Sequence, residues 1–145
     1  MFSWVKSLFE RSAGSTTPTG AAGERAAEEF LRRERGFSIV TRNWRSPRDR
    51  RDEIDLVCRD GGVLVFVEVK TRAAGALVPG YYTVDARKKK VLRRACTAYL
   101  RALAGDARPQ TFRLDVVEVA MPGGGGPPEV RHFENVPLFP KSFGG

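Results

Sequence analysis

Residues 53–71 read EIDLVCRDGGVLVFVEVKT, and this stretch carries the strongest signal for the fold: two strands joined by a tight turn. Its first part alternates, so Ile54, Leu56 and Cys58 are expected to share one face of a strand. The Asp-Gly-Gly sequence that follows is a strong hairpin signal. The remainder, VLVFVEVKT, is apolar on both faces until its end, which is typical of a central strand. The stretch therefore predicts a β-hairpin in the middle of a sheet.

The predicted central strand carries two charges on an otherwise apolar face. Leu64 and Phe66 are followed at the same spacing by Glu68 and Lys70. Burial of an ionised group without a partner is costly, so these charges need an explanation. One interpretation is an ordinary ion pair between Glu68 and Lys70 at the end of a strand.

A second interpretation comes from Asp55 on the first strand of the hairpin. Asp55 faces Phe66 if Asp-Gly forms the two-residue turn, and it faces Glu68 if Gly-Gly forms the turn. Opposed or diagonal residues lie about 5–8 Å apart, and two carboxylates at that distance repel unless a cation lies between them. The pattern predicts that Asp55 and Glu68 bind Mg²⁺ or Mn²⁺ and that Lys70 assists hydrolysis of a phosphodiester bond.

A helix is predicted before the hairpin, over residues 21–35. Its apolar stripe includes Ala27 and Leu31, and Glu24 falls in line with both at spacings of three and seven. One interpretation makes Glu24 a further carboxylate of the site. The other makes it a charge at the helix start that interacts with the helix dipole.

The remaining elements predict an α/β domain around a central mixed β-sheet, in the order α-β-β-β-α-β-β. The expected strands are 37–42, 53–59, 63–71, 111–120 and 130–133, and the second helix follows Asp85 and ends near 103. The domain is assigned to residues 21–135. Residues 1–20 are expected to form an amphipathic segment with a flexible linker, and residues 136–145 a C-terminal tail.

The charge of the chain favours polyanionic partners. Twenty-five Lys and Arg oppose 17 Asp and Glu, a net charge of +8, which points first to nucleic acid; the alternative is ordinary solvated surface charge. Basic residues gather in the loop before the hairpin and at the start of the second helix. The candidates for phosphate contacts are Arg45, Arg48, Arg50, Arg51, Arg87, Lys88, Lys89 and Lys90. Lys88 also falls in line with the apolar stripe of its helix and is expected to point toward the site.

The cysteines, the apolar runs and the single histidine mainly exclude certain kinds of site and partner. Cys58 and Cys96 have no metal-type spacing and predict reduced, buried thiols in a cytoplasmic protein. No run approaches the roughly 20 apolar residues of a membrane span, so no membrane partner is expected. His132 has no partner motif and is expected as a half-exposed strand residue.

Several short motifs resemble the YraN family. They are Gly23-Glu24, Ala26-Ala27, Asn43-Trp44-Arg45, residues 53–57 (EIDLV), residues 65–72 (VFVEVKTR) and residues 113–117 (RLDVV). That family consists of uncharacterised bacterial proteins regarded as candidate endonucleases, with a restriction-endonuclease-like fold similar to the PD-(D/E)XK nucleases and near the archaeal Holliday-junction resolvases. Asp52 departs from the family, which usually has Gly before Glu-Ile-Asp.

The resemblance implies a nuclease core of Asp55, Glu68 and Lys70, with Glu24 as the helix carboxylate and Lys88 as the basic residue that opens the second helix. It also implies DNA as the substrate, including branched DNA, and a homodimer by analogy with junction resolvases. The alternative to a metal-dependent endonuclease is a non-catalytic nucleic-acid-binding module with a vestigial site.

Overall fold

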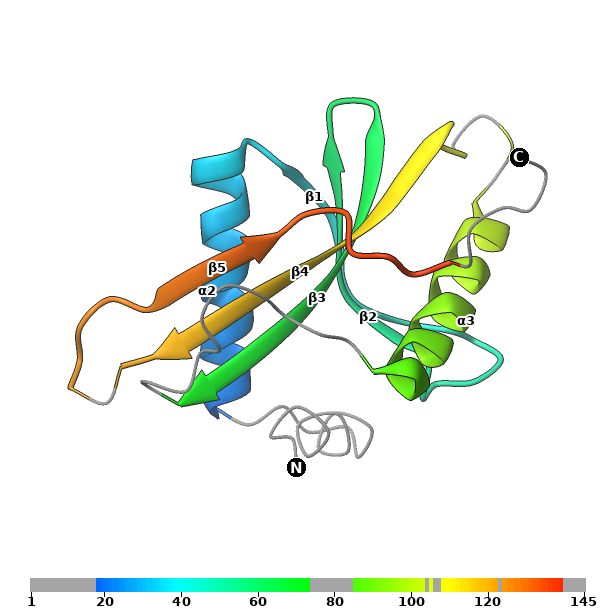
Figure 1. Cartoon of the computed structure of the whole chain (residues 1–145). Helices are drawn as coiled ribbons and strands as arrows, with labels where there is room; N and C mark the ends of the chain where they lie inside the picture. Colours follow the sequence, from blue (N-terminus) through cyan, green and yellow to red (C-terminus); the bar gives the residue numbers. More distant parts are fainter. Residues whose placement is uncertain (1–17, 74–84, 104, 106–107, 123, 140–145) are drawn as a thin grey trace.

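The protein folds as a five-stranded mixed sheet with one helix against each face (Figure 1). The computed structural model describes residues 18–73, 85–103, 105, 108–122 and 124–139. The elements are α2 (Pro18–Arg35), β1 (Ser38–Arg45), β2 (Glu53–Asp60), β3 (Val63–Ala73), α3 (Ala86–Ala102), β4 (Thr111–Met121) and β5 (Glu129–Phe133). This order confirms the predicted α/β class with the arrangement α-β-β-β-α-β-β.

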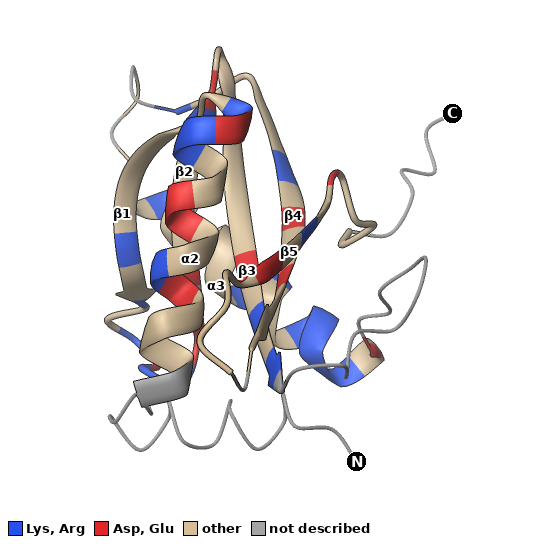
Figure 2. Ribbon diagram, turned by 90° about the vertical axis from the view of Figure 1, so that its left-hand side faces the viewer, with Lys and Arg blue, Asp and Glu red and all other residues tan. Residues whose placement is uncertain are grey.

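The strands lie side by side in sequence order, from β1 to β5. The pairs β1–β2, β2–β3 and β4–β5 are antiparallel, whereas β3 and β4 are parallel. A parallel pair needs a crossover connection, and α3 lies within the segment that connects β3 to β4. In Figure 2, α2 lies in front of the strands and α3 behind them.

Two apolar cores follow from this layering. On one face, Ala27 and Leu31 of α2 pack with Leu56, Val67 and Val117 of the sheet. On the other face, residues of α3 pack with side chains of all three central strands; this core contains Ile54, Val57, Leu64, Phe66, Leu92, Ala95, Cys96, Tyr99, Leu114, Val116 and Leu138. The sheet is therefore buried on both faces, as the apolar sequence of β3 predicted.

The hairpin between β2 and β3 adopts the second of the two expected registers. Asp60 pairs with Val63, so the turn consists of Gly61 and Gly62. Gly61 has a φ of 59°, in the left-handed region that glycine adopts without steric cost. The regular pairs end at Leu56 opposite Val67. Extending this register by one position sets Asp55 opposite Glu68.

The start of β2 departs from the expected alternation. Leu56 and Cys58 belong to the core under α2, as expected together, but Ile54 belongs to the core under α3. The prediction that all three share a face was therefore wrong for Ile54. The registered pairing of β2 with β3 stops at Leu56, and beyond it β2 curves toward α3, so a flat alternation no longer applies (Figure 1).

Two boundaries also differ from the sequence prediction. β1 continues through Arg45 instead of ending at residue 42, so the basic loop is shorter than expected. At the other end, Leu138 is buried in the α3-side core, and the Leu138 carbonyl accepts a hydrogen bond from Arg93 at 2.9 Å. The described part of the expected tail thus packs on the domain. The amphipathic segment at residues 1–17 lies outside the described residues.

Gly23 on α2 lies directly against Thr71 on β3. A Cβ atom on Gly23 would lie 2.1 Å from Thr71 Oγ1 and 2.8 Å from Thr71 Cγ2, so α2 would have to move. We expect Gly23→Ala to lower the free energy of unfolding by about 1–3 kcal/mol, the usual cost of overpacking. This loss should outweigh the gain of roughly 1 kcal/mol that alanine brings to a helix interior. Urea unfolding measures the difference.

The control is Gly62→Ala, because no atom lies within 4 Å of a Cβ at that position. That variant should unfold near the wild-type midpoint. Thr71→Ala should partly rescue Gly23→Ala by removing two of the three atoms that a Cβ would meet. An unchanged unfolding midpoint for Gly23→Ala alone would contradict the close contact between α2 and β3.

Candidate active site

Four charged side chains are buried between the central strands and the start of α3. The exposed fraction is 2% for Asp55, 2% for Glu68, 1% for Lys70 and 3% for Lys88. Three of them come from the β2–β3 hairpin, and the fourth comes from the first turns of α3. The structure therefore buries all four of these residues, which the sequence singled out, and it pairs Glu68 with Lys88.

The carboxylate of Asp55 is fixed by the backbone of the neighbouring strand. Asp55 Oδ2 accepts a hydrogen bond from the Val69 backbone N–H at 2.8 Å. This contact crosses from β2 to the residue after Glu68, at the point where the regular β2–β3 pairing has ended. A buried carboxylate held in this way has a defined orientation beside Glu68, which a ligand for a metal ion needs.

Lys88 reaches the site because α3 begins beside it. Asp85 caps the helix, with Oδ1 accepting from the Lys88 backbone N–H at 2.9 Å. Lys88 Nζ lies 3.3 Å from Glu68 Oε2, and both side chains are almost fully buried. Lys88 was also a candidate for surface phosphate contacts. Its burial supports the other expectation, that it points toward the site.

The chemistry of this group suits a hard divalent cation. Asp55 and Glu68 supply carboxylate oxygens, the ligands that Mg²⁺ and Mn²⁺ prefer. Lys70 and Lys88 balance the two negative charges, and such balance makes burial of ionised groups tolerable. Among the residues that the structure describes, no three His, Cys, Asp or Glu side chains form a group that could hold a metal ion.

Glu24 lies on the α2 side of the sheet. It is half-buried and lines a cavity of about 400 Å³ with Arg25, Glu28, Arg42 and other residues. Asp55, Glu68 and Lys70 do not line this cavity. Arg42 and Glu28 form a bidentate ion pair across it, at 2.6 and 2.7 Å. The role of Glu24 in the site stays a prediction.

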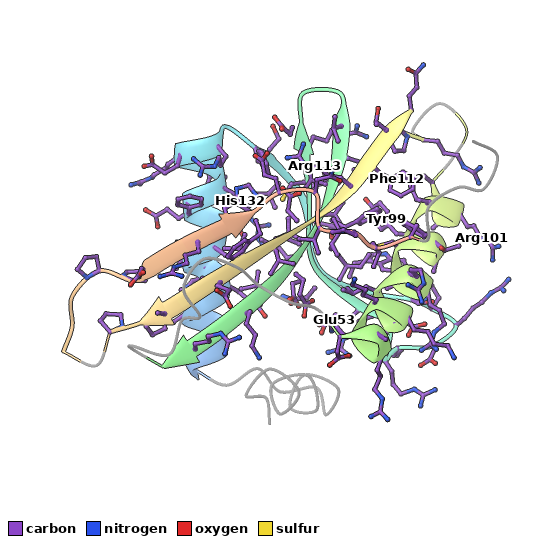
Figure 3. The ribbon with its side chains drawn as sticks, viewed as in Figure 1. Glu53, Tyr99, Arg101, Phe112, Arg113 and His132 are labelled. Atoms are coloured by element: carbon purple, nitrogen blue, oxygen red, sulfur yellow. The ribbon has the colours of Figure 1, made fainter. Side chains whose placement is uncertain are left out.

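The basic loop after β1 and the basic face of α3 meet at one cavity. Arg94 of α3 contacts both carboxylate oxygens of Asp52, at 2.8 and 3.2 Å, and so holds the loop against the helix. A cavity of about 390 Å³ lies there, lined by Ser46, Arg48, Asp49, Asp52, Arg93, Arg94, Thr97, Ala98, Arg101 and Phe139. Figure 3 shows Arg101 on the outer side of α3. The loop and α3 thus meet at one basic surface, and of the predicted phosphate contacts Arg48 lines its cavity.

Several arginines of this surface already have acidic or carbonyl partners. Arg45 lies 3.4 Å from Glu53 and donates to the Arg50 carbonyl at 2.9 Å. Arg51 pairs with Asp49, which lowers the pKa of that carboxyl group to about 2. Figure 3 shows Glu53 at the end of β2 that lies near α3. The remaining exposed members of the predicted set are Arg48, Arg50, Arg87 and Lys90, with Lys89 half-buried.

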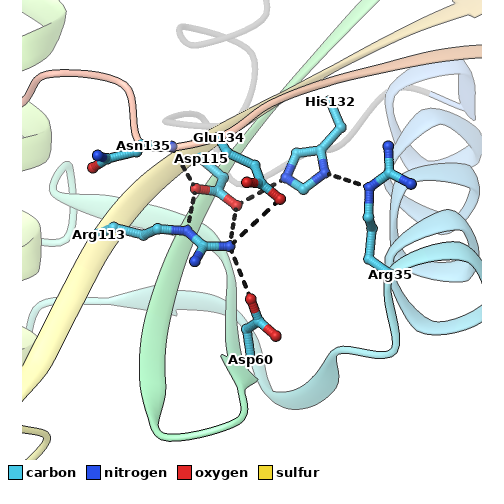
Figure 4. Close-up of polar contacts among 7 residues, drawn as sticks. All are labelled: Arg35, Asp60, Arg113, Asp115, His132, Glu134 and Asn135. Carbon is cyan, nitrogen blue, oxygen red and sulfur yellow. Dashed lines mark hydrogen bonds and ion pairs between the residues drawn. The ribbon is translucent and has the colours of Figure 1, made fainter.

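A second buried polar cluster is centred on Asp115 of β4, near the hairpin turn (Figure 4). Asp115 receives both ends of the Arg113 guanidinium, at 2.8 and 3.1 Å, and the Asn135 backbone N–H at 2.9 Å. Its other close contact is His132 Nε2 at 2.8 Å. All the acceptor positions of this carboxylate are engaged by protein groups, which indicates a structural role in joining β4 to β5.

His132 lies on β5 as a half-buried residue, as expected, but its side chain is only 1% exposed. Arg35 Nε donates to His132 Nδ1 at 3.2 Å, so Nε2 carries the proton that Asp115 accepts. Burial raises the pKa of Asp115, but hydrogen bonds from His132 and Arg113 outweigh it and hold the pKa below its ordinary value. No local sequence pattern indicates this partnership, because the two residues lie on different strands.

The two cysteines are buried free thiols, as predicted. Burial raises the pKa of Cys58 to about 12 and moves the pKa of Cys96 further upward. A thiol with so high a pKa is a poor nucleophile, so neither belongs to the chemistry of the site. None of the described helices is long and apolar enough to span a membrane.

The fold and the buried charged group define an α/β domain of the restriction-endonuclease-like type. The model of the family described as "Uncharacterised protein family UPF0102" matches residues 23–119. These residues include Glu24, Asp55, Glu68, Lys70 and Lys88. The chain belongs to the UPF0102 family, which confirms the resemblance to the YraN family seen in its motifs.

Individual relatives cover most of the chain. A UPF0102 protein of Anaeromyxobacter dehalogenans is 46% identical over 114 residues, 79% of each chain. A UPF0102 protein of Symbiobacterium thermophilum is 45% identical over 116 residues, 80% of this chain and 92% of the relative. A third, from Beutenbergia cavernae, is 42% identical over 117 residues, 81% of this chain and 93% of the relative. The similarity therefore extends over about four fifths of the chain.

Proposed function

We propose that this protein is a metal-dependent endonuclease that hydrolyses phosphodiester bonds of DNA, including branched DNA. The observation that carries the proposal is the buried group of Asp55, Glu68, Lys70 and Lys88 at one end of the β2–β3 hairpin. Charged groups are rarely buried together in a small domain unless they pair or serve a function. The restriction-endonuclease-like fold supports nuclease chemistry by analogy with other proteins of that fold.

Each residue has a distinct part in the proposed reaction. Asp55 and Glu68 would hold Mg²⁺ or Mn²⁺, which supplies an activated water and stabilises charge on a phosphoryl oxygen. Lys70 orients the attacking water and places positive charge beside the pentavalent phosphoryl group. Lys88 holds the Glu68 carboxylate in place through the 3.3 Å ion pair. Glu24 is proposed as an additional carboxylate that orients water from the α2 side.

The test is a cleavage assay on a panel of DNA substrates. Branched, flapped, single-stranded and duplex DNA are incubated with the protein and Mg²⁺ or Mn²⁺, with a chelator as the negative control. Metal-dependent cleavage of at least one substrate supports the proposal, and a preference for junctions would identify branched DNA. Tight binding without cleavage of any substrate would favour the non-catalytic binding module instead. Sedimentation of the same preparation tests the predicted homodimer.

The basic surface around α3 and the loop after β1 should supply the phosphate contacts. Charge reversal of Arg48, Arg50 and Arg51, or of Arg87, Lys89 and Lys90, is expected to weaken binding to every DNA sequence. Each set removes three cations, so the slope of log affinity against log salt should become shallower by about 3. Fluorescence anisotropy over a salt series measures both quantities.

The matched control reverses Arg32, Arg33 and Arg108, which are exposed and lie outside this surface. That variant has the same net charge as the others. If all three variants lose affinity and salt dependence equally, binding depends on net charge alone. If only the control variant is impaired, the DNA lies away from the loop after β1 and the start of α3.

A further inference from the structure

Arg72 continues the charged face of β3 beyond Lys70. The alternation that sets Phe66, Glu68 and Lys70 on one face brings Arg72 to the same face two residues later. The parallel register of β3 and β4 sets Lys70 beside Glu118. Glu118 therefore lies on this face as well, and it is 0% exposed. Neither Arg72 nor Glu118 is among the site residues expected from the sequence.

The contact between these two residues is single rather than bidentate. Arg72 Nε lies 3.1 Å from Glu118 Oε2. Within the described residues, the other oxygen, Glu118 Oε1, is buried and has no hydrogen-bond partner. Arg94 and Arg42, by contrast, each contact both oxygens of their carboxylates. The terminal NH₂ groups of Arg72 are therefore not taken up by Glu118.

This geometry orients the Arg72 guanidinium through Nε and leaves its two NH₂ groups without a contact to Glu118. The Arg72 side chain is 17% exposed, so it reaches the surface next to a carboxylate that is fully enclosed. A buried carboxylate fixes the side chain at Nε, and the two NH₂ groups then form a fork directed at another acceptor. A phosphate is the acceptor that such a fork fits, because it can take two parallel N–H hydrogen bonds.

We infer that Arg72 is a phosphate-binding residue of the proposed active site and that Glu118 is the residue that positions it. The inference rests on the proposed function. Residues two apart on a strand are separated by about 6.7 Å, so Arg72 would hold the phosphate that neighbours the cleaved bond rather than the cleaved phosphate at Lys70. The ligand class is a nucleic-acid strand with consecutive phosphodiester groups.

A second arginine pair provides a matched comparison. Arg113 is also 17% exposed, and its partner Asp115 is also 0% exposed. Asp115, however, contacts the Arg113 guanidinium through both oxygens and is further bound by His132 and Asn135. That pair is closed and structural, whereas Glu118, within the part of the chain that the structure describes, has an unused acceptor and contacts Arg72 only at Nε. Arg113→Lys is therefore the control for Arg72→Lys.

The experiment measures affinity for a fluorescein-labelled DNA duplex in the presence of a chelator, when no cleavage occurs. Arg72→Lys keeps the positive charge and the contact with Glu118 but loses the planar fork. It is expected to bind DNA roughly 10-fold more weakly, the effect of losing one charge-assisted contact, with an unchanged salt slope. Arg113→Lys should bind as wild type. The thermal unfolding midpoint of each variant shows that it is folded.

Glu118→Gln tests the positioning role. If Glu118 acts by orienting Arg72, this variant loses affinity, and combining it with Arg72→Lys causes no further loss. A purely structural Glu118 would lower the unfolding midpoint without changing the affinity of the folded protein, and that result overturns its positioning role. The double variant Arg72→Met with Glu118→Met removes both charges together and avoids an unpaired buried carboxylate. It should bind as weakly as Arg72→Lys or more weakly, with a salt slope shallower by about 1.

These affinity and cleavage measurements distinguish a failure of this inference from a failure of the proposed function. Wild-type affinity in a folded Arg72→Lys variant overturns the inference, even if the wild-type protein cleaves DNA and Lys70→Met does not. Absence of cleavage by the wild-type protein, together with weakened DNA binding by Arg72→Lys, keeps the phosphate site and overturns the endonuclease. A wild-type protein that binds no DNA overturns both.

Discussion

Lys70→Met is expected to lower the rate of DNA cleavage by roughly 10²- to 10⁴-fold, the range for removal of a positioned acid–base or electrostatic group. Methionine keeps the length and volume of the lysine side chain at a position that is 1% exposed, so the core should stay filled. DNA affinity should change little, because one charge contributes a small part of the total attraction of a protein with a net charge of +8. Single-turnover cleavage and fluorescence anisotropy separate the two effects.

Arg108→Met is the matched control. Arg108 is an exposed cation outside the basic surface, so its loss removes the same charge without touching the buried group or the predicted phosphate contacts. It should cleave at close to the wild-type rate. A folded Lys70→Met variant that also cleaves at the wild-type rate would show that Lys70 is a structural lysine.

Asp55→Asn is expected to abolish the binding of Mg²⁺ or Mn²⁺, and cleavage with it. Asparagine can still accept the hydrogen bond from the Val69 N–H, which the wild-type carboxylate accepts at 2.8 Å, so the variant removes charge and preserves the local fold. In the wild type, a cation at about 100 times its Kd should raise the free energy of unfolding by about 2.7 kcal/mol. In Asp55→Asn this rise should vanish. Titration calorimetry and thermal unfolding with and without the cation measure it.

The stability of Asp55→Asn relative to wild type in the absence of a divalent cation is a second test. Asp55 and Glu68 are both buried, and they are opposite one another when the β2–β3 register is extended by one pair, so removal of one negative charge should relieve repulsion. Asp55→Asn should then be at least as stable as wild type when no divalent cation is present. Asp60→Asn serves as the control, since Asp60 lies on the same strand at the hairpin turn and contacts Arg113 instead. A cation-dependent stabilisation of equal size in Asp55→Asn and wild type would remove Asp55 from the set of metal ligands.

Local patterns in the sequence were sufficient to predict the hairpin and the charged face at its centre. Strand alternation and the Asp-Gly-Gly signal are local properties. The structure contains the elements that they predict, namely β2, β3 and the glycine turn between them. Because a strand has a period of two, the identity of the residues that share a face with Glu68 followed from counting. The inward direction of Lys88 followed in the same way, from the helical period that lines it up with Leu92.

Local periodicity was insufficient where the regular pairing of β2 with β3 ends. Ile54 was assigned to the face of Leu56 because both have the same parity along β2. In the structure, β2 curves toward α3 after its regular pairing with β3 ends, and Ile54 joins the other core. Curvature of this kind depends on how the sheet twists around the helix that covers it, which no single strand encodes.

Which charged residues from distant parts of the chain meet depends on long-range packing. Arg72 and Glu118 are 46 positions apart in sequence, and Asp115 and His132 are 17 apart on neighbouring strands. Each pair depends on the register between β4 and its neighbours, which the α3 crossover and the packed cores fix together. The sequence could state that Glu118 shares a face with Leu114 and Val116. It could not state that this face continues that of Lys70, because the relative position of two strands joined by a helix is set by long-range packing rather than by any local period.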